Sequence, residues 1–438
     1  MRPSCRNCTL RREKCVYNKT TSPPSKHSPL VSAELLNQTR LVLSGYDTWS
    51  SNASTITGTP SPGPEGSGTN LLYEPMWLPT DRNLTDMRLM WHYTTNTFSS
   101  LSSWTGTDSR VFNVLRVKLL EHALDTPFLL DGILGLTAMH MNFLGRTDVP
   151  PALASMYRAR AMAGYRKAIE EADPKTYPAL LISSIVVCGL SSAEFRGPDA
   201  KPLFILDWLT VWQGIGLIIQ LTQLRSVANS NIALLFYRPE IDLNETPTHL
   251  PSNLLFMITS IRPTDPDFDS VDIYYTFLKY LGALYRELAL EGLGPLLNLR
   301  IITFLSFSTT EFIELARQRR PRAAIIIAHY LVFVKLVKTL WWMSDISDRE
   351  IQNISGLVGL GALSEFMRVP KAALRVTEPI ELARLLLENP TWEPPIGKEN
   401  AATWPLGAFV DQDGKPVRET GWEIGRVDQG FLFDINNS

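Results

Sequence analysis

The sequence predicts an all-α protein: a large helical body that follows a short cysteine-bearing head and an unstructured linker. Three observations lead to this prediction. From about residue 77 onward, apolar residues recur at the three- and four-residue spacing of amphipathic helices. Strand signals are few, and AFVDQDGKPV at 408–417, an Asp-Gly turn between short apolar runs, is the one hairpin candidate. No repeat of fixed period is visible in the sequence, so a solenoid is not expected.

The composition is that of a globular protein with an unevenly placed charge. The 438 residues are 45% hydrophobic and 20% charged, and the formal net charge is -2. Residues 1–19 hold six basic side chains against Glu13 alone, a net of +5, so the remainder of the chain is acidic. A small cationic head on an acidic body indicates that any contact with a polyanion is made by the head.

The four cysteines are too few for a disulfide framework in a chain of this length. Cys5, Cys8 and Cys15 fall within eleven residues, whereas Cys188 stands alone in an apolar run and is expected to be a buried, inert thiol. The N-terminus lacks the apolar stretch of a secretory signal, so secretion is not expected.

Changes in composition divide the chain into four parts. The head covers residues 1–18, and a linker covers 19–76. Between Ser50 and Thr69, sixteen of twenty residues are Ser, Thr, Pro or Gly, which cannot bury enough apolar surface to fold. The helical body covers 77–390, and a tail of unknown role covers 391–438.

Within the body, the apolar spacing predicts a succession of helices, the first of them opening at Asp81 as a plausible cap. Helices are expected at 81–102, 110–124, 128–144, 152–172, 176–193, 203–224, 271–290, 296–317, 323–344, 348–366 and 379–388. The stretch from Ala323 to Met343 is long enough to span a bilayer. Because it contains Lys335 and Lys338 near one helical face, we interpret it as a buried helix of a large core and expect no membrane span.

The head carries the motif with the most specific chemistry. In RPSCRNCTLRREKCVY, a gap of two residues lets Cys5 and Cys8 grip one metal ion from a single turn. Cys15 follows six residues after Cys8, far enough for a short helix to return the chain to the same ion. Thiolates suit zinc, which takes four tetrahedral ligands in structural sites. We therefore predict a zinc site at these three cysteines; a fourth ligand is not obvious, and His27 is the one candidate nearby.

This spacing and its flanks resemble the fungal Zn₂Cys₆ regulators, in which two C-x2-C-x6-C triplets share two zinc ions. The match is to the second triplet, with Pro3 before it and Val16 and Tyr17 after it. The resemblance implies that Cys5 bridges the two zinc ions and that Cys8 and Cys15 bind the second.

This sequence contains no match to the first triplet of that family, which carries the base-reading helix. The basic residues that remain are expected to contact DNA phosphates, which gives affinity without sequence choice. They are Arg6, Arg11, Arg12 and Lys14.

Two segments of the body resemble the sterol uptake control subgroup of the same family. The start of the subgroup's regulatory domain is similar to the segment that begins at Trp77, WLPTDRNLTDMRLMWHYTTNTFSSLS. The subgroup's later helices are similar to the segment that contains Trp341 and Trp342, HYLVFVKLVKTLWWMSDIS. The resemblance covers most of 77–366 and implies that 77–390 is a helical regulatory domain of a transcription factor. It also makes an apolar ligand cavity between helices worth considering.

The leading functional hypothesis is therefore a nuclear transcription factor for RNA polymerase II genes. The resemblance implies zinc as cofactor, CGG-type DNA elements as targets if the full cluster exists, a homodimer, an apolar small-molecule effector, and control of a secondary-metabolite gene cluster or of sterol or lipid genes. The alternative is a helical ligand-sensing or protein-interaction regulator that has lost autonomous DNA binding. An enzyme is not expected, because no nucleophile elbow, P-loop, H-E-x-x-H or dinucleotide-binding motif is found.

Two further groups of polar residues are interpreted as structural. The aspartates at 265, 267, 269 and 272 alternate like a calcium loop but lack its glycine and closing glutamate, so we expect a solvated loop before a helix. His92 is expected to be a packed or partly exposed side chain, and His140 and His329 have no partner at metal-ligand spacing.

Overall fold

The computed structural model describes residues 84–101, 109–196, 200–222, 232, 235, 241–338 and 340–395. Every regular element in these ranges is a helix, which confirms the all-α prediction. The head, the linker and the predicted hairpin at 408–417 lie outside the described residues.

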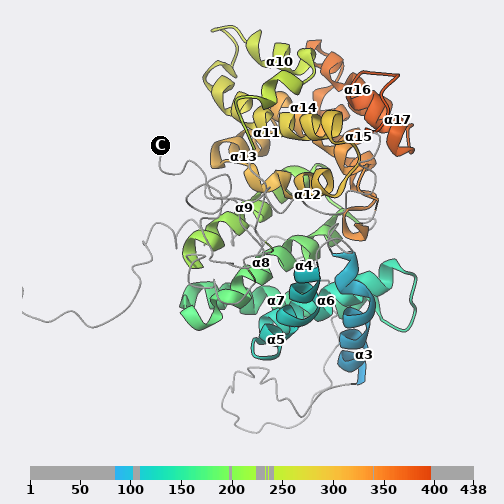
Figure 1. Ribbon diagram of the computed structural model, residues 1–438. Coiled ribbons are helices and arrows are strands. Elements are labelled where there is room, and N and C mark those ends of the chain that lie inside the picture. Colours follow the sequence, from blue (N-terminus) through green and yellow to red (C-terminus); the bar gives the residue numbers. More distant parts are fainter. Residues whose placement is uncertain are drawn as a thin grey trace, which may run out of the picture.

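The N-terminal half, α3 to η6, forms the lower part of the molecule in Figure 1. α6 lies at its centre: thirteen of its seventeen residues are buried, so it is apolar on all sides, as expected of a helix enclosed by others. The elements are α3 (Leu84–His92), η2 (Tyr93–Thr97), η3 (Phe98–Ser100), α4 (Ser109–Asn113), η4 (Val114–Lys118), α5 (Leu119–Leu124), α6 (Pro127–Phe143), α7 (Pro151–Glu171), η5 (Pro174–Thr176), α8 (Tyr177–Ser191) and η6 (Ser192–Phe195).

The C-terminal half, η9 to α17, forms the upper part, with α14 enclosed by its neighbours (Figure 1). All twelve residues from Ala323 to Val334 are buried. The elements are η9 (Thr246–His249), α10 (Ser252–Thr259), η10 (Phe268–Ser270), α11 (Val271–Leu290), α12 (Pro295–Thr303), η11 (Phe304–Phe307), α13 (Thr310–Arg317), α14 (Pro321–Val334), η12 (Trp341–Met343), α15 (Ile346–Val358), η13 (Ala362–Met367), α16 (Arg368–Ala373) and α17 (Pro379–Leu386).

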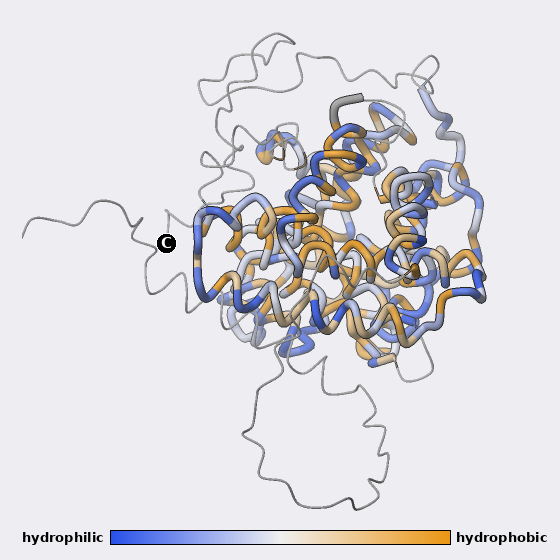
Figure 2. The backbone as a smooth tube through the Cα atoms, turned by 90° about the horizontal axis from the view of Figure 1, so that it is seen from below, coloured by the Kyte–Doolittle hydropathy of each residue, from blue (hydrophilic) through white to orange (hydrophobic). Residues whose placement is uncertain are grey.

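α9 (Phe204–Thr222) lies between the two halves and packs against both. On one side it contacts α8, and on the other it contacts η11 and α13. Hydrophobic stretches of the chain lie mostly inside the folded part of the molecule, and hydrophilic stretches lie mostly at its outer turns (Figure 2). Because α9 is apolar on nearly all sides, it continues the core from one half into the other.

Three of the predicted helices are interrupted. The expected helix at 348–366 ends at Val358, where Gly359 has a φ of +67°, and η13 follows from Ala362. The expected helix at 296–317 breaks after η11, and the chain turns by 81° before α13 begins. The new helix starts there because Thr309 caps it: its hydroxyl accepts a hydrogen bond from the Phe312 N–H at 3.2 Å. The expected helix at 323–344 ends at Val334, and Lys335 hydrogen-bonds the Ala373 carbonyl at 2.6 Å.

The acidic loop before α11 is an ion-pair joint and not a fully solvated loop. Arg322 at the start of α14 lies 2.7 Å from a carboxylate oxygen of Asp265 and 2.7 Å from one of Asp267. Asp267 is 3% exposed, so the expectation of a solvated loop is wrong for this residue. A paired arginine supplies the compensating charge that a buried carboxylate needs.

Two described helical segments are long and apolar enough to cross a membrane by length and composition alone: Pro174–Phe195 and Phe204–Thr222. The bent pair Pro295–Phe307 and Thr310–Arg317 passes the same test if it is taken as one span. In the first two segments, 78% and 72% of the most apolar 18 residues are buried inside the protein, so these side chains form part of the core. The predicted absence of a membrane span stays a prediction.

Candidate functional site: the tryptophan junction

The residues that the sequence singles out for metal and DNA lie outside the described part of the chain. They are Cys5, Cys8 and Cys15 for zinc and Arg6, Arg11, Arg12 and Lys14 for phosphates. Among the residues that are described, no group of three or more His, Cys, Asp or Glu side chains is placed to hold a metal ion. Cys188 is buried, and burial raises the pKa of its thiol, as expected for an inert cysteine.

The candidate site in the described part is the place where the segment 340–350 enters the N-terminal half. Trp341 and Trp342 are adjacent in sequence but contact different elements. The Trp341 indole stacks on the His140 ring of α6, with centroids 4.9 Å apart and planes 22° apart. Its Nε1–H donates a hydrogen bond to the Ser100 hydroxyl at 3.1 Å, at the end of η3. Trp341 is thus buried among residues of the N-terminal half.

Arg196, at the end of η6, holds Trp341 from a second direction. Its guanidinium donates a hydrogen bond to the Trp341 carbonyl at 2.8 Å and lies 6.0 Å from the centroid of the indole ring. Burial lowers the pKa of Arg196 from its usual value. An arginine beside a π-face and a carbonyl gains both a cation–π contact and a hydrogen bond, so this residue fixes both backbone and ring.

Trp342 points into an aromatic cluster on α9. Its ring lies 6.4 Å from that of Trp208, in an edge-to-face arrangement, and 6.4 Å from that of Trp212, in a stacked one. The Trp208 Nε1–H donates to the Ser191 hydroxyl at 2.7 Å, which ties this cluster to the end of α8. Aromatic contacts of this kind add stability beyond the area that they bury.

The same segment reaches the N-terminus of α9 through Glu350 on α15. A Glu350 carboxylate oxygen accepts a hydrogen bond from the Ile205 N–H at 3.0 Å, and the other accepts one from Asn353 at 2.9 Å. Glu350 is completely buried, and burial raises the pKa of its carboxyl. A carboxylate at this position accepts a hydrogen bond from an N–H that has no partner within the helix. Its negative charge also interacts favourably with the positive end of the helix dipole. Beside it, Arg349 donates to the Phe195 carbonyl at 2.8 Å.

Two histidines lie behind the Trp341 indole. The His92 and His140 rings are 5.6 Å apart, and His140 Nδ1 is 2.9 Å from the Thr97 hydroxyl oxygen. Burial, with a smaller contribution from His92, lowers the pKa of His140 to about 4. Burial also lowers the pKa of His92. Both rings are therefore neutral near pH 7, and a neutral ring stacks on the indole without placing a second cation beside Arg196.

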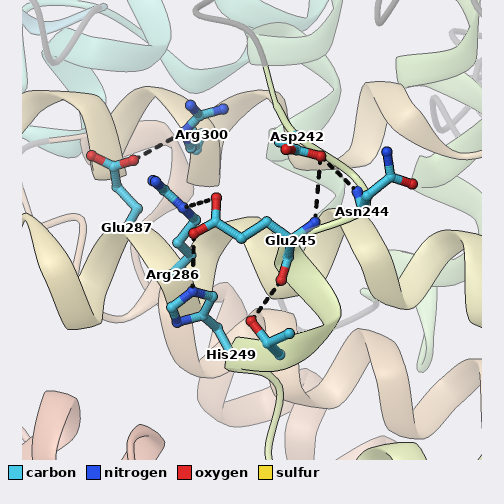
Figure 3. Close-up of polar contacts among 8 residues, drawn as sticks. Asp242, Asn244, Glu245, His249, Arg286, Glu287 and Arg300 are labelled. Carbon is cyan, nitrogen blue, oxygen red and sulfur yellow. Dashed lines mark hydrogen bonds and ion pairs between the residues drawn. The ribbon is translucent and has the colours of Figure 1, made fainter.

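A second polar cluster, on the far side of α11, is a structural joint (Figure 3). Glu245 pairs with Arg286 at 3.1 Å and lies 3.7 Å from a ring nitrogen of His249, so η9 is fixed to α11. The next residue along α11, the buried Glu287, pairs with Arg300 of α12 at 3.3 Å. These pairs join neighbouring helices within the C-terminal half and do not reach the N-terminal half.

The sequence drew attention to some of these residues but not to others. Trp341 and Trp342 stand out as a rare aromatic pair, and His92 is packed, as expected. Ser100, Arg196 and Glu350 carried no signal, because a serine after a helix and charged residues at helical spacing are ordinary surface features in a sequence. The junction holds no reactive constellation of side chains among these residues; its contacts can transmit movement between helices.

Comparison with known proteins finds a family match over one part of the chain, most of the N-terminal half and α9. Residues 88–230 match the fungal-specific transcription factor domain. A curated relative, a Zn(2)-C6 fungal-type transcription factor of Gibberella zeae, is 20% identical over 298 residues, which cover 63% of this chain and 59% of the relative. The matched region thus spans about three fifths of that relative, and the junction joins the matched domain to the helices that follow it.

Proposed function

We propose that this chain is a fungal Zn(2)-C6-type regulator that acts in the nucleus as a transcription factor for RNA polymerase II genes. The observation that carries the proposal is the match of 88–230 to the fungal-specific transcription factor domain. This family is a class of transcription factors and not of enzymes, so the expectation of a non-enzyme is confirmed. Membership of the sterol uptake control subgroup stays a prediction.

In this proposal the head binds zinc through Cys5, Cys8 and Cys15. Their spacing supports the proposal, and so does the name of the relative, a Zn(2)-C6 fungal-type factor. Three thiolates are one short of the tetrahedral set that zinc prefers, so at least one ligand comes from elsewhere. Zinc content of the purified full chain tests the assignment. Cys8→Ala is expected to lose zinc, whereas Cys188→Ala, which alters a buried thiol in α8, is expected to keep it. Equal zinc in all three proteins would contradict the head as the metal site.

The head is also proposed to contact DNA, through Arg6, Arg11, Arg12 and Lys14. Contacts of these side chains with phosphates release counterions, so binding must weaken steeply as salt rises. A complete cluster would add base contacts worth about 1–3 kcal/mol each, which survive salt better.

Titration of the full chain against a CGG-containing duplex and a scrambled duplex, at two salt concentrations, measures both contributions. Weak, salt-sensitive binding that is equal on both duplexes is the expected result for the head as it stands in this sequence. A strong, salt-resistant preference for the CGG duplex would show instead that base reading is complete. No binding at either salt concentration would favour the alternative function, a helical regulator that acts through protein partners.

The finer predictions extend this proposal and follow from the resemblance. The first is the division of the chain into a head (1–18), a linker (19–76), a regulatory domain (77–390) and a tail (391–438). The others are a homodimer, an apolar small-molecule effector, and control of secondary-metabolite genes or of sterol and lipid genes. Reporter assays with and without candidate apolar compounds would test the effector directly.

A further inference from the structure

The first helical elements of the described chain form one continuous run, 84–100. α3, η2 and η3 follow each other without a break, and the residues at both joints, His92 and Thr97, keep right-handed helical dihedrals. A run of this length is about 25 Å long. Its first residue, Leu84, is where the chain from the head arrives, and its last, Ser100, is the residue that hydrogen-bonds Trp341.

A π-turn lies in the middle of this run. η2 (Tyr93–Thr97) has π-helical hydrogen bonding, and the Tyr93 hydroxyl donates at 2.7 Å to the Leu115 carbonyl in η4, which is a second π-turn. Such turns hold one extra residue within a helix and occur frequently at functional sites. If the turn reverts to α-helical bonding, residues on its two sides rotate relative to each other by about 100°, one residue's share of the 3.6-residue turn.

Contacts from the C-terminal half hold the run on the far side of this turn. Trp341 bonds Ser100 directly, and Thr97 bonds His140, on which the Trp341 indole stacks. The opposite end of the segment 340–350 is anchored elsewhere: Glu350 caps α9, and Asp348 on the same helix bonds Lys335 at 2.6 Å. A displacement of α15 against α14 or α9 therefore displaces Trp341.

We propose that the segment 340–350 is a wedge by which the C-terminal half sets the register of the π-turn and hence the rotation of the N-terminal end of the run 84–100. The wedge in place holds the π-turn; withdrawal of Trp341 releases it to α-helical bonding. Resting on the proposed function, this assigns a regulatory device to the body: the state of α14 and α15 sets how α3 is turned at the N-terminal end of the described helices. An element with two arrangements is what physical coupling between distant parts of a protein requires.

Amide hydrogen exchange on the full chain tests the wedge without reference to DNA. Trp341→Phe keeps an aromatic ring on His140 but loses the N–H that bonds Ser100. Ser100→Ala removes the other partner and also the hydrogen bond that the Ser100 hydroxyl donates to the Thr97 carbonyl at 2.7 Å. Trp341→Phe is expected to raise exchange about fivefold at 93–100, the effect of losing one net hydrogen bond, and Ser100→Ala at least as much. The double variant is expected to exchange no faster than Ser100→Ala alone, because Ser100→Ala already removes the bond that Trp341→Phe removes. Leu360→Ser, at a residue of the same half that is 97% exposed, is the matched control and is expected to leave 93–100 unchanged.

Two results would overturn the wedge: faster exchange confined to 340–350, or additive effects of the two changes. If Trp341→Phe unfolds the protein, Arg196→Lys takes its place, because this change weakens the hold on the Trp341 carbonyl and leaves the hydrogen bonds within 84–100 intact; unchanged exchange at 93–100 in this variant would overturn the wedge. A transcriptional reporter then tests the regulatory part. At equal protein levels, the same variants are expected to change output several-fold, and unchanged output would overturn the regulatory role of the wedge. A wild-type chain without any output would contradict the proposed function and leave the exchange result standing.

Discussion

At the scale of single residues, α11 and η9 approach each other closely at Gly282. A Cβ atom at this position in α11 would lie 2.4 Å from the carbonyl oxygen of Thr246 and 2.9 Å from its carbonyl carbon, both in η9. The obstacle is backbone, which cannot rotate away as a side chain can. η9 is also fixed to α11 by the Glu245–Arg286 pair, so the two elements cannot separate freely.

Gly282→Ala is therefore expected to destabilise the protein by about 2–3 kcal/mol, within the usual range for overpacking. Gly216 in α9 is the matched control, because a Cβ there meets nothing within 4 Å. Gly216→Ala is expected to stabilise by about 0.5–1 kcal/mol, since it removes backbone freedom from the unfolded chain. Urea unfolding of both variants measures the difference, and equal effects of the two substitutions would contradict the close approach in η9.

What the sequence predicts at this scale depends on whether a residue acts locally. Cys188 was recognisable as a buried thiol because the apolar run around it reports its environment directly. Asp267 was not, because its burial depends on Arg322, 55 residues later. Glu350 is similar: the N–H that it caps lies 145 residues earlier in the chain. Contacts over such separations leave no pattern in a single sequence.

At the scale of elements, α9 depends on a residue outside itself. Its N-terminus is capped by Glu350 of α15, whose carboxylate accepts a hydrogen bond from the Ile205 N–H. Removing a buried partner leaves this donor unsatisfied and empties the space that the carboxylate filled.

Glu350→Ala is expected to lower the free energy of unfolding by about 2–4 kcal/mol, because a buried donor and Asn353 both lose their acceptor. Asp348→Ala, two residues earlier on the same helix, is the control. Asp348 is half exposed, and Lys335 keeps the Ala373 carbonyl as a partner, so the loss is expected to be at most about 1 kcal/mol. Chemical unfolding followed by far-UV circular dichroism measures both, and a loss below 1 kcal/mol for Glu350→Ala would contradict its role as a cap.

Element boundaries were predictable where a cap or a change of period marks them locally. α6, α7 and α11 begin and end within a residue of the expected limits. The break before α13 had a signal, the Ser-Thr-Thr cluster with Thr309 as a cap, that the continuous apolar spacing concealed. The end of α14 at Val334 depends on contacts outside the helix. The chain turns away from the helix axis there, and Trp341 and Trp342 pack against α6 and α9. α10 and α16 are short, and such segments show too few turns for a period to emerge.

At the scale of the whole molecule, the helical class and the resemblance to the fungal regulators followed from the sequence, while the arrangement of the two halves did not. Apolar spacing shows which face of a helix is buried but not which helix covers it. Thus Trp341 and Trp342 were recognisable as unusual, but their division between α6 and α9 required the structure. The zinc and phosphate residues of the head rest on spacing and resemblance, and they lie outside the described residues.

Each half also holds a buried neutral histidine, and this makes stability depend on pH. In the N-terminal half, His140 has a pKa lowered to about 4 by burial. In the C-terminal half, His329 is completely buried, and burial lowers its pKa to about 4 as well. His329 Nε2 lies 2.9 Å from the Phe366 carbonyl, which can only accept, so Nε2 carries the proton and Nδ1 accepts from the Tyr285 hydroxyl at 3.1 Å.

Unfolding exposes both rings, whose ordinary pKa is about 6.5. Between pH 6.5 and 4, the unfolded chain therefore binds protons that the folded protein excludes, and stability falls as the pH falls. The stability is fully present above pH 6.5, and these two histidines cause no further loss below pH 4. Each contributes about 1.4 kcal/mol between pH 7.5 and 5.5, since one pKa unit corresponds to that free energy. Asp131 acts in the opposite sense, because burial raises its pKa to about 6, so the total for the wild type is smaller than the sum.

Comparison of variants isolates the histidines from these opposing carboxyl groups. Urea unfolding of the wild type, His140→Gln and His329→Gln at pH 7.5 and 5.5 gives a change in stability with pH for each protein. Both substitutions lower stability at pH 7.5, but neither glutamine can take up a proton. Each variant is therefore expected to lose about 1.4 kcal/mol less than the wild type on acidification. The carboxyl groups are common to all three proteins and cancel in this difference. A wild-type pH dependence that persists unchanged in both variants would mean that neither ring is kept neutral by the fold.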